Sequence, residues 1–240
     1  MTGRPAPDPI PPFLLLGMTA VTGIVDAVSF LALGHVFTAN MTGNVVFLGF
    51  AASGAAGVSI VRSGVALIAF LLGAAAGGRI AFQMTSHPPH HWASRAFGVD
   101  AGLLLAGAGA ALGLRSSAGE DSAPLFAVIT LTAIAMGLRN ATVRRLAIAD
   151  LTTTVLTLTI TGLAADSSMA GGANPRWRRR LASVLCMFAG AAAGGFMLRH
   201  SVSLPLLVCG LASAAAALMV GARPRFPGGR STGDGAGPRG

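Results

Sequence analysis

Asp26 is the acidic side chain that stands out within the long apolar stretch from Phe13 to Leu33. A charged side chain at the centre of a bilayer costs about 2.5 to 3.5 kcal/mol on insertion scales, so such a residue usually faces a protein interior or a wet cavity. Two interpretations follow. Asp26 makes a structural hydrogen bond to a neighbouring helix, or it forms a proton or cation site or pairs with an arginine such as Arg139.

Polar residues also crowd the starts of two other apolar stretches. The first group is Thr38, Asn40, Thr42 and Asn44, and the second is Asp150, Thr152, Thr153 and Thr154. Capping a helix needs only one such residue, and each group has several. Each group therefore has two interpretations: it caps a helix at the membrane surface, or it lines a substrate site or pore. Helix starts inside the membrane would direct their free amides at a bound anion. Asp150 would repel an anion unless an arginine paired with it, so a cation or a neutral polar solute fits equally.

The two groups belong to a tandem repeat. Gly23 to Ala27 followed by Thr38 to Val45 returns as Gly137 to Ala141 followed by Ile148 to Val155, which aligns Asp26 with Asn140. Duplicated halves with polar residues at matching places are typical of transporters and channels, whose site lies between the repeats. The predicted substrate-binding or pore-lining residues are Asp26, Thr38, Asn40, Thr42, Asn44, Arg139, Asn140, Asp150, Thr152, Thr153 and Thr154.

A third match consists of small residues only. The segment from Gly73 to Gly78 recurs letter for letter from Gly190 to Gly195. Such segments let two membrane helices approach closely. Their equivalent places predict that the third and seventh apolar runs cross each other at a pseudo-twofold axis.

The composition identifies an integral membrane protein, with 53% hydrophobic residues, 10% charged residues and a mean hydropathy of +0.69. We expect an all-α fold with a cytosolic tail at residues 1–12, one repeat at 13–115, a second at 123–222 and a disordered tail at 223–240. The apolar runs are Phe13 to Leu33, Met41 to Ile60, Ser63 to Gln83, Phe97 to Leu114, Ala123 to Leu138, Leu151 to Ala165, Leu181 to Leu198 and Val202 to Ala222.

Arginine positions distinguish two topologies. If the second and sixth runs are short, broken or re-entrant, six helices span and the 17 basic residues divide fourteen inside to three outside. If all eight runs span, the division is eleven to six. The positive-inside rule therefore favours six spans, with two inverted repeats and both termini in the cytosol.

Other classes of function find little support in the sequence. The arginines sit in short loops rather than on one face, so no nucleic-acid partner is expected. His87, His90 and His91 have no carboxylate or cysteine beside them, so we expect no metal, and no cofactor-binding or catalytic motif appears. The chain is therefore not expected to be an enzyme.

The motifs resemble a known family. Gly34 to Asn44, together with Gly137 to Ala141 and Asp150 to Thr154, is similar to the two hallmark segments of the bacterial YoaK family, whose members share the domain of unknown function 1275. The resemblance covers Phe13 to Ala222 and implies a multi-span protein of the bacterial inner membrane. It implies no substrate and no catalytic residues.

These observations predict a transporter or channel for a small polar solute or ion, with its site where the second and sixth runs meet. The alternative is a non-transporting membrane scaffold or accessory subunit, in which the polar residues only cap and pack helices. The expected partners are the lipid bilayer and the solute, and the sequence leaves room for a homo-oligomer.

Overall fold

The computed structural model describes residues 10–84, 86–114, 121–146 and 156–222, and all regular structure in these ranges is helical. The all-α prediction is therefore confirmed for this part of the chain. The helices are α1 (Pro12–Ala32), α2 (Met41–Ala52), α3 (Ile60–Gln83), α4 (Pro89–Ala111), α5 (Ala123–Leu146), α6 (Leu156–Ala165), the short 3-10 helix η1 (Ser168–Ala170), α7 (Trp177–Met197) and α8 (Ser203–Gly221).

Five of the described helices are long and apolar enough to cross a membrane, namely α1, α3, α5, α7 and α8. Large apolar side chains such as Leu72 on α3, Phe188 on α7 and Leu218 on α8 are exposed on the protein surface. An apolar surface of this kind needs a lipid environment. The protein is therefore a membrane protein, as its composition predicts.

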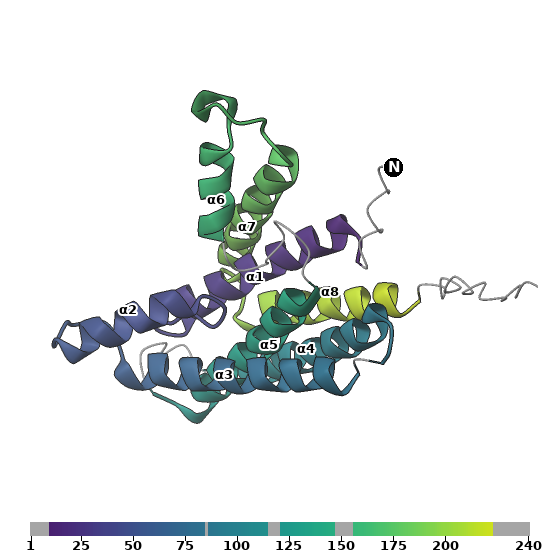
Figure 1. Cartoon of the computed structure of the whole chain (residues 1–240). Coiled ribbons are helices and arrows are strands. Elements are labelled where there is room, and N and C mark those ends of the chain that lie inside the picture. The colour runs from purple at the N-terminus through teal and green to yellow at the C-terminus, as the bar shows by residue number, and fades with distance from the viewer. Residues whose placement is uncertain (1–9, 85, 115–120, 147–155, 223–240) are drawn as a thin grey trace, which may run out of the picture.

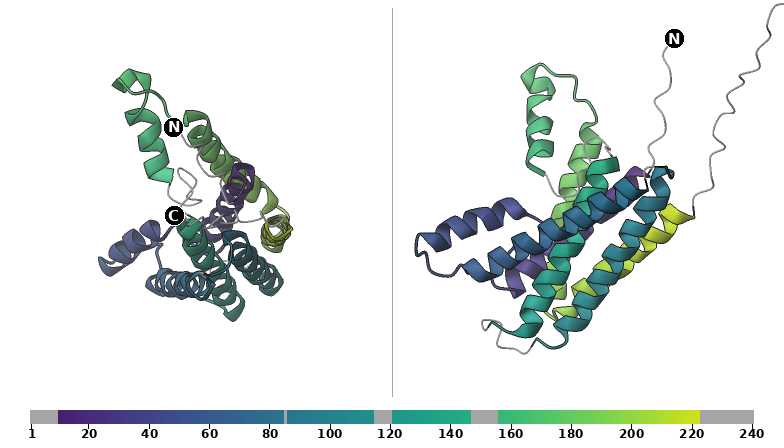
Figure 2. Two further views of the ribbon diagram at one scale, coloured as in Figure 1. Left: turned by 45° about the vertical axis from the view of Figure 1, so that its right-hand side comes forward. Right: turned by 60° about the horizontal axis from the view of Figure 1, so that its bottom comes forward.

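The helices pack as three pairs, α1 with α7, α3 with α5, and α4 with α8 (Figures 1 and 2). Further contacts between α4 and α5 and between α1 and α8 join the pairs. No contact joins α3 to α7 in the described structure. The prediction that the third and seventh apolar runs cross each other is therefore wrong.

The small-residue segments pack instead against the helices that carry Gly23 and Gly137. A Cβ atom at Gly73 would collide with the carbonyl oxygen of Ile134, and one at Gly137 with that of Phe70, so α3 and α5 touch through their backbones. Likewise, a Cβ atom at Gly190 would meet the carbonyl oxygen of Ala20, where α7 crosses α1. Glycine is required at these crossings because any side chain would separate the helices.

The two short helices each form a hairpin with the helix that follows. In the described residues α2 packs on α3 and meets α1 through the Phe47 and Phe30 rings, and α6 packs on α7 and η1, so both hairpins project from the bundle (Figures 1 and 2). Helices of 12 and 10 residues are about 18 and 15 Å long, against a hydrocarbon core of about 30 Å. Neither helix alone can cross a bilayer.

The apolar core lies between the paired helices. One cluster of buried residues includes Val25, Phe97 and Met136, and joins α1, α4 and α5. A second cluster includes Ile129 and Leu206, and continues the core between α5 and α8. These contacts fix the inner faces of α1 and α5, the two helices that carry Asp26 and Asn140.

Candidate functional site

A cavity of about 1040 Å³ lies where the starts of α2 and α6 approach α3 and the C-terminal half of α5. Its walls combine carboxamides, hydroxyls and guanidinium groups with apolar side chains of all sizes. The described lining residues are Ala39, Asn40, Met41, Thr42, Phe70, Ala74, Gly78, Asn140, Ala141, Val143, Arg144, Arg145 and Thr157. Pockets that bind small molecules commonly have volumes of about 300 to 1,000 Å³, so this one has room for a small solute and water.

Asn40 reaches the cavity because the link after α1 turns the chain back on itself. Gly34 and His35 both adopt positive φ angles, of 84° and 57°, and the amide of His35 bonds to the carbonyl of Phe30 at 3.2 Å. This reversal places Asn40 beside Asp26, fourteen residues earlier in the chain. The Asn40 carboxamide then donates a hydrogen bond to Asp26 Oδ2.

The hydrogen bond to Asp26 occupies the Asn40 side chain, which is therefore not used as a helix cap. Asn40 occupies the N-cap position of α2, but its side chain makes no capping bond to the first turn. It contacts Asp26 on one side and the cavity on the other. Asp26 itself is buried, at 7% exposure, and does not line the cavity, but its partner Asn40 does.

Asn44 and Thr38, by contrast, do not line the cavity. Asn44 accepts a hydrogen bond from the amide of Phe37 at 2.9 Å and donates one to the carbonyl of the same residue at 2.5 Å. The Phe37 ring stacks on Phe30 and Phe47, with centroids 5.2 and 5.8 Å apart. Asn44 therefore holds the turn between α1 and α2 in shape. Thr38 is fully buried beside this turn.

Arg139 is also absent from the cavity wall. Its guanidinium forms a fully buried ion pair with Asp100 on α4, with an N–O distance of 2.5 Å, and donates to Ser213 Oγ on α8 at 2.8 Å. The predicted pairing of Arg139 with Asp26 is therefore wrong. Successive residues of an α-helix point about 100° apart. Arg139 consequently faces α4 and α8 while its neighbour Asn140 faces the cavity.

Asp100 is the residue that the sequence reasoning missed. It lies within the apolar run from Phe97 to Leu114 and is 0% exposed. Its place near the beginning of that run made it less conspicuous than Asp26, although both are acids within apolar segments. The same rule that singles out Asp26 would have found Asp100.

The second repeat contributes Asn140, Arg144, Arg145 and Thr157 to the cavity. Asn140 Nδ2 donates to the carbonyl of Met136 at 2.9 Å, which orients its carboxamide along α5. Arg144 and Arg145 form the last turn of α5 and are exposed. The predicted residues Asp150, Thr152, Thr153 and Thr154 lie outside the described residues.

The described site can therefore hydrogen-bond a solute but has few groups for other chemistry. Carboxamides both donate and accept, hydroxyls do the same, and guanidinium groups only donate. Within the described ranges, no three His, Cys, Asp or Glu side chains gather in a way that could hold a metal ion. Of the predicted residues, Asn40, Thr42 and Asn140 meet at the cavity.

The chain is similar to a family of proteins and to a bacterial transmembrane protein. A family described as "Protein of unknown function (DUF1275)" matches residues 14–219 of the chain. The UPF0700 transmembrane protein YoaK of Bacillus subtilis (strain 168) is 37% identical over 158 residues, which is 64% of this chain. The match spans 65% of that relative, slightly less than two thirds of its length. No solved structure matches the chain.

Proposed function

The chain belongs to the DUF1275 family, and from that premise we propose that it is a transporter or channel for a small polar solute or ion in the bacterial inner membrane. The observation that carries the proposal is the cavity in which Asn40 and Asn140 both take part. These residues come from the two copies of the repeated motif in the sequence. A polar cavity between repeats is where transporters of this kind bind their substrates.

The pairing of the helices supports an arrangement of two inverted repeats. The sequence repeat equates α1 with α5, α2 with α6, and α3 with α7. The contact of α1 with α7 then corresponds to that of α5 with α3, and the α2–α3 hairpin corresponds to the α6–α7 hairpin. Each half thus gives its first helix to the other half. A twofold relation between the halves would account for both correspondences.

The short α2 and α6 helices support six spans with both termini in the cytosol. In that arrangement α4 is the sixth span, and α2 and α6 enter the membrane and return. The loop between α2 and α3 then lies outside the cell and the C-terminal end of α3 inside. Single cysteines at Ala55 and Arg79, both exposed, test this. A membrane-impermeant thiol reagent added to whole cells should label the first and spare the second, and the reverse pattern would indicate eight spans.

Transport is tested in proteoliposomes loaded with a fluorescent volume or ion reporter. We expect at least one class among glycerol, potassium acetate, potassium phosphate and ammonium chloride to cross faster than in empty liposomes. Asn40→Ala and Asn140→Ala should reduce that flux while leaving the yield of folded protein unchanged. The matched control is Asn44→Ala, because Asn44 is a similar carboxamide that faces away from the cavity.

The scaffold alternative has its own supporting observation. Asn44 and Asn140 both hydrogen-bond backbone atoms, as expected of residues that only shape helices. In a scaffold, none of the solutes would cross and the three alanine variants would differ only in stability. Equal flux in protein-containing and empty liposomes for every solute would favour this alternative.

A further inference from the structure

Among the described residues, the charge on the cavity wall is one-sided. Arg144 and Arg145 are the charged residues among the described lining residues, and none of those lining residues is acidic. No carboxylate of the described part of the chain pairs with either guanidinium. Arginines are common at the cytosolic ends of membrane helices. These two differ because they border the same cavity as Asn40 and Asn140.

The start of α2 adds to this positive potential. A helix N-terminus carries a partial positive charge and amide groups without intrahelical partners. Met41 and Thr42, the first residues of the 12-residue α2, line the cavity. Asn40 does not cap these amides, because its side chain is engaged with Asp26. The amides of the first turn and the two guanidinium groups therefore border the same space.

Among the described residues, the nearby carboxylates do not offset this charge at the cavity wall; Asp150 lies outside those residues. Asp26 lies behind Asn40 and is bonded to it. Asp100 is sealed between α4, α5 and α8 by Arg139 and Ser213. Both acids are thus held in the protein interior, and neither lines the cavity. A cation in the cavity would meet two guanidinium groups without a facing carboxylate among the described lining residues.

We propose that the cavity binds a small oxyanion, of the carboxylate or phosphate class, between Arg144, Arg145 and the first turn of α2. A planar guanidinium matches two oxygens of such an anion, and charge-assisted hydrogen bonds of this kind are stronger than neutral ones. The carboxamides of Asn40 and Asn140 would complete the contacts. This inference rests on the proposed function for its biological meaning, because it names the class of solute that would be moved.

Binding is tested on the purified full-length chain, separately from transport. Thermal unfolding and isothermal titration are measured with potassium phosphate and potassium acetate, against potassium chloride at the same ionic strength. Either oxyanion should raise the melting temperature more than chloride does. Arg144→Gln and Arg145→Gln should each raise the dissociation constant about tenfold, the expected effect of losing one charge-assisted hydrogen bond.

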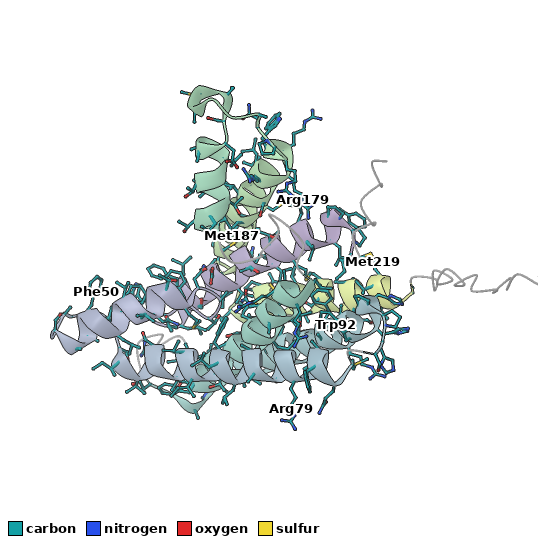
Figure 3. The ribbon with its side chains drawn as sticks, viewed as in Figure 1. Phe50, Arg79, Trp92, Arg179, Met187 and Met219 are labelled. Atoms are coloured by element: carbon teal, nitrogen blue, oxygen red, sulfur yellow. The ribbon has the colours of Figure 1, made fainter. Side chains whose placement is uncertain are left out.

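Control variants separate loss of binding from loss of folding. Arg79→Gln removes an arginine from α3 that points away from the bundle (Figure 3), so it should leave oxyanion binding unchanged. Arg144→Lys and Arg145→Lys keep the charge and should retain part of the affinity. An equal effect of Arg79→Gln would overturn the assignment of the site, and so would unchanged binding in both glutamine variants.

The two proposals fail in different ways. Oxyanion binding that depends on Arg144 and Arg145, without flux of any solute, would uphold the inference and overturn the transport proposal. Flux of glycerol or ammonium without specific binding of phosphate or acetate would uphold the transport proposal and overturn the proposed oxyanion site. Faster flux of acetate or phosphate, reduced in the two glutamine variants, would support both.

Discussion

Two buried carboxylates, Asp26 and Asp100, have opposite surroundings in this protein. Asp100 is fully enclosed and meets a full positive charge on Arg139, which also donates to a hydroxyl from a third helix. Asp26 meets the neutral carboxamide of Asn40, which also borders the cavity. The first arrangement joins α4, α5 and α8 into one unit. The second connects a buried acid to a wall that a solute can touch.

The difference shows how a membrane protein can use similar residues for different purposes. A buried ion pair resists rearrangement, because separating its members leaves an uncompensated charge in a medium of low dielectric constant. A hydrogen bond to a neutral amide costs much less to break and to re-form. We therefore expect the Asp100 pair to maintain the structure and the Asp26 pair to respond to what occupies the cavity.

The largest effect should come from breaking the Asp100 pair. Arg139→Met leaves Asp100 buried without its partner and should lower the free energy of unfolding by about 3 to 5 kcal/mol. Thermal unfolding of the detergent-purified protein would measure this loss. The double variant Asp100→Leu with Arg139→Met should recover much of it, because no buried charge remains unpaired.

The matched control for that experiment is Arg62→Met. Arg62 pairs with Asp121 at 2.8 Å; the Arg62 side chain is 11% exposed, but that of Asp121 is 52% exposed, so the pair reaches solvent on one side. Pairs exposed to solvent contribute about 0 to 1 kcal/mol. If Arg62→Met lowered the melting temperature as much as Arg139→Met, burial of the Asp100 pair would not explain its importance.

A smaller effect is expected at Asp26. Asp26→Leu removes the acceptor for Asn40 and should cost about 1 to 3 kcal/mol, since it leaves a part-buried donor unsatisfied. Asp26→Asn retains a carbonyl acceptor and should leave folding largely intact, while altering flux in proteoliposomes. If the flux through the Asp26→Asn variant equalled that of wild type, the charge of Asp26 would have no part in transport.

The comparison of Asn40 with Asn44 should give a smaller change in stability but a clear separation of roles. Asn44→Ala should lower stability by about 1 kcal/mol, because two hydrogen bonds to Phe37 are lost from the turn. Asn40→Ala should cost at least as much stability, because the buried Asp26 loses its side-chain donor, but it should reduce flux far more. Melting temperature and flux are measured on the same preparations, and equal flux in the two variants would show that Asn40 is only structural.

The smallest net change in stability is predicted for a double variant that exchanges the two partners. The variant with both Asp26→Asn and Asn40→Asp still has one acid and one amide in the pair. The acid now stands at the second position, as in the other repeat, where Asn140 corresponds to Asp26 and Asp150 to Asn40. Its stability should lie closer to wild type than the sum of the two single changes, by a coupling energy of about 0.5 to 3 kcal/mol. Strict additivity in thermal unfolding would mean that the two side chains do not depend on each other.

The sequence by itself determined the helical class, the membrane environment, the family and the short second and sixth helices. These properties follow from local composition, because the length and polarity of a segment decide whether it can cross a bilayer. The sequence also identified Asp26, Asn40 and Asn140 as polar residues that need a reason to lie among apolar ones. The repeated motif of the sequence aligns Asp26 with Asn140.

Only the tertiary structure decided which residues meet. Arg139 pairs with Asp100 rather than Asp26, and α3 crosses α5 rather than α7. The cavity takes in Arg144 and Arg145, which the sequence left out of the site, and omits Asn44 and Thr38, which it put in. The reason is geometric. A rotation of about 100° per residue turns neighbouring side chains to different helices, and the partner helix is chosen by packing between segments far apart in the chain.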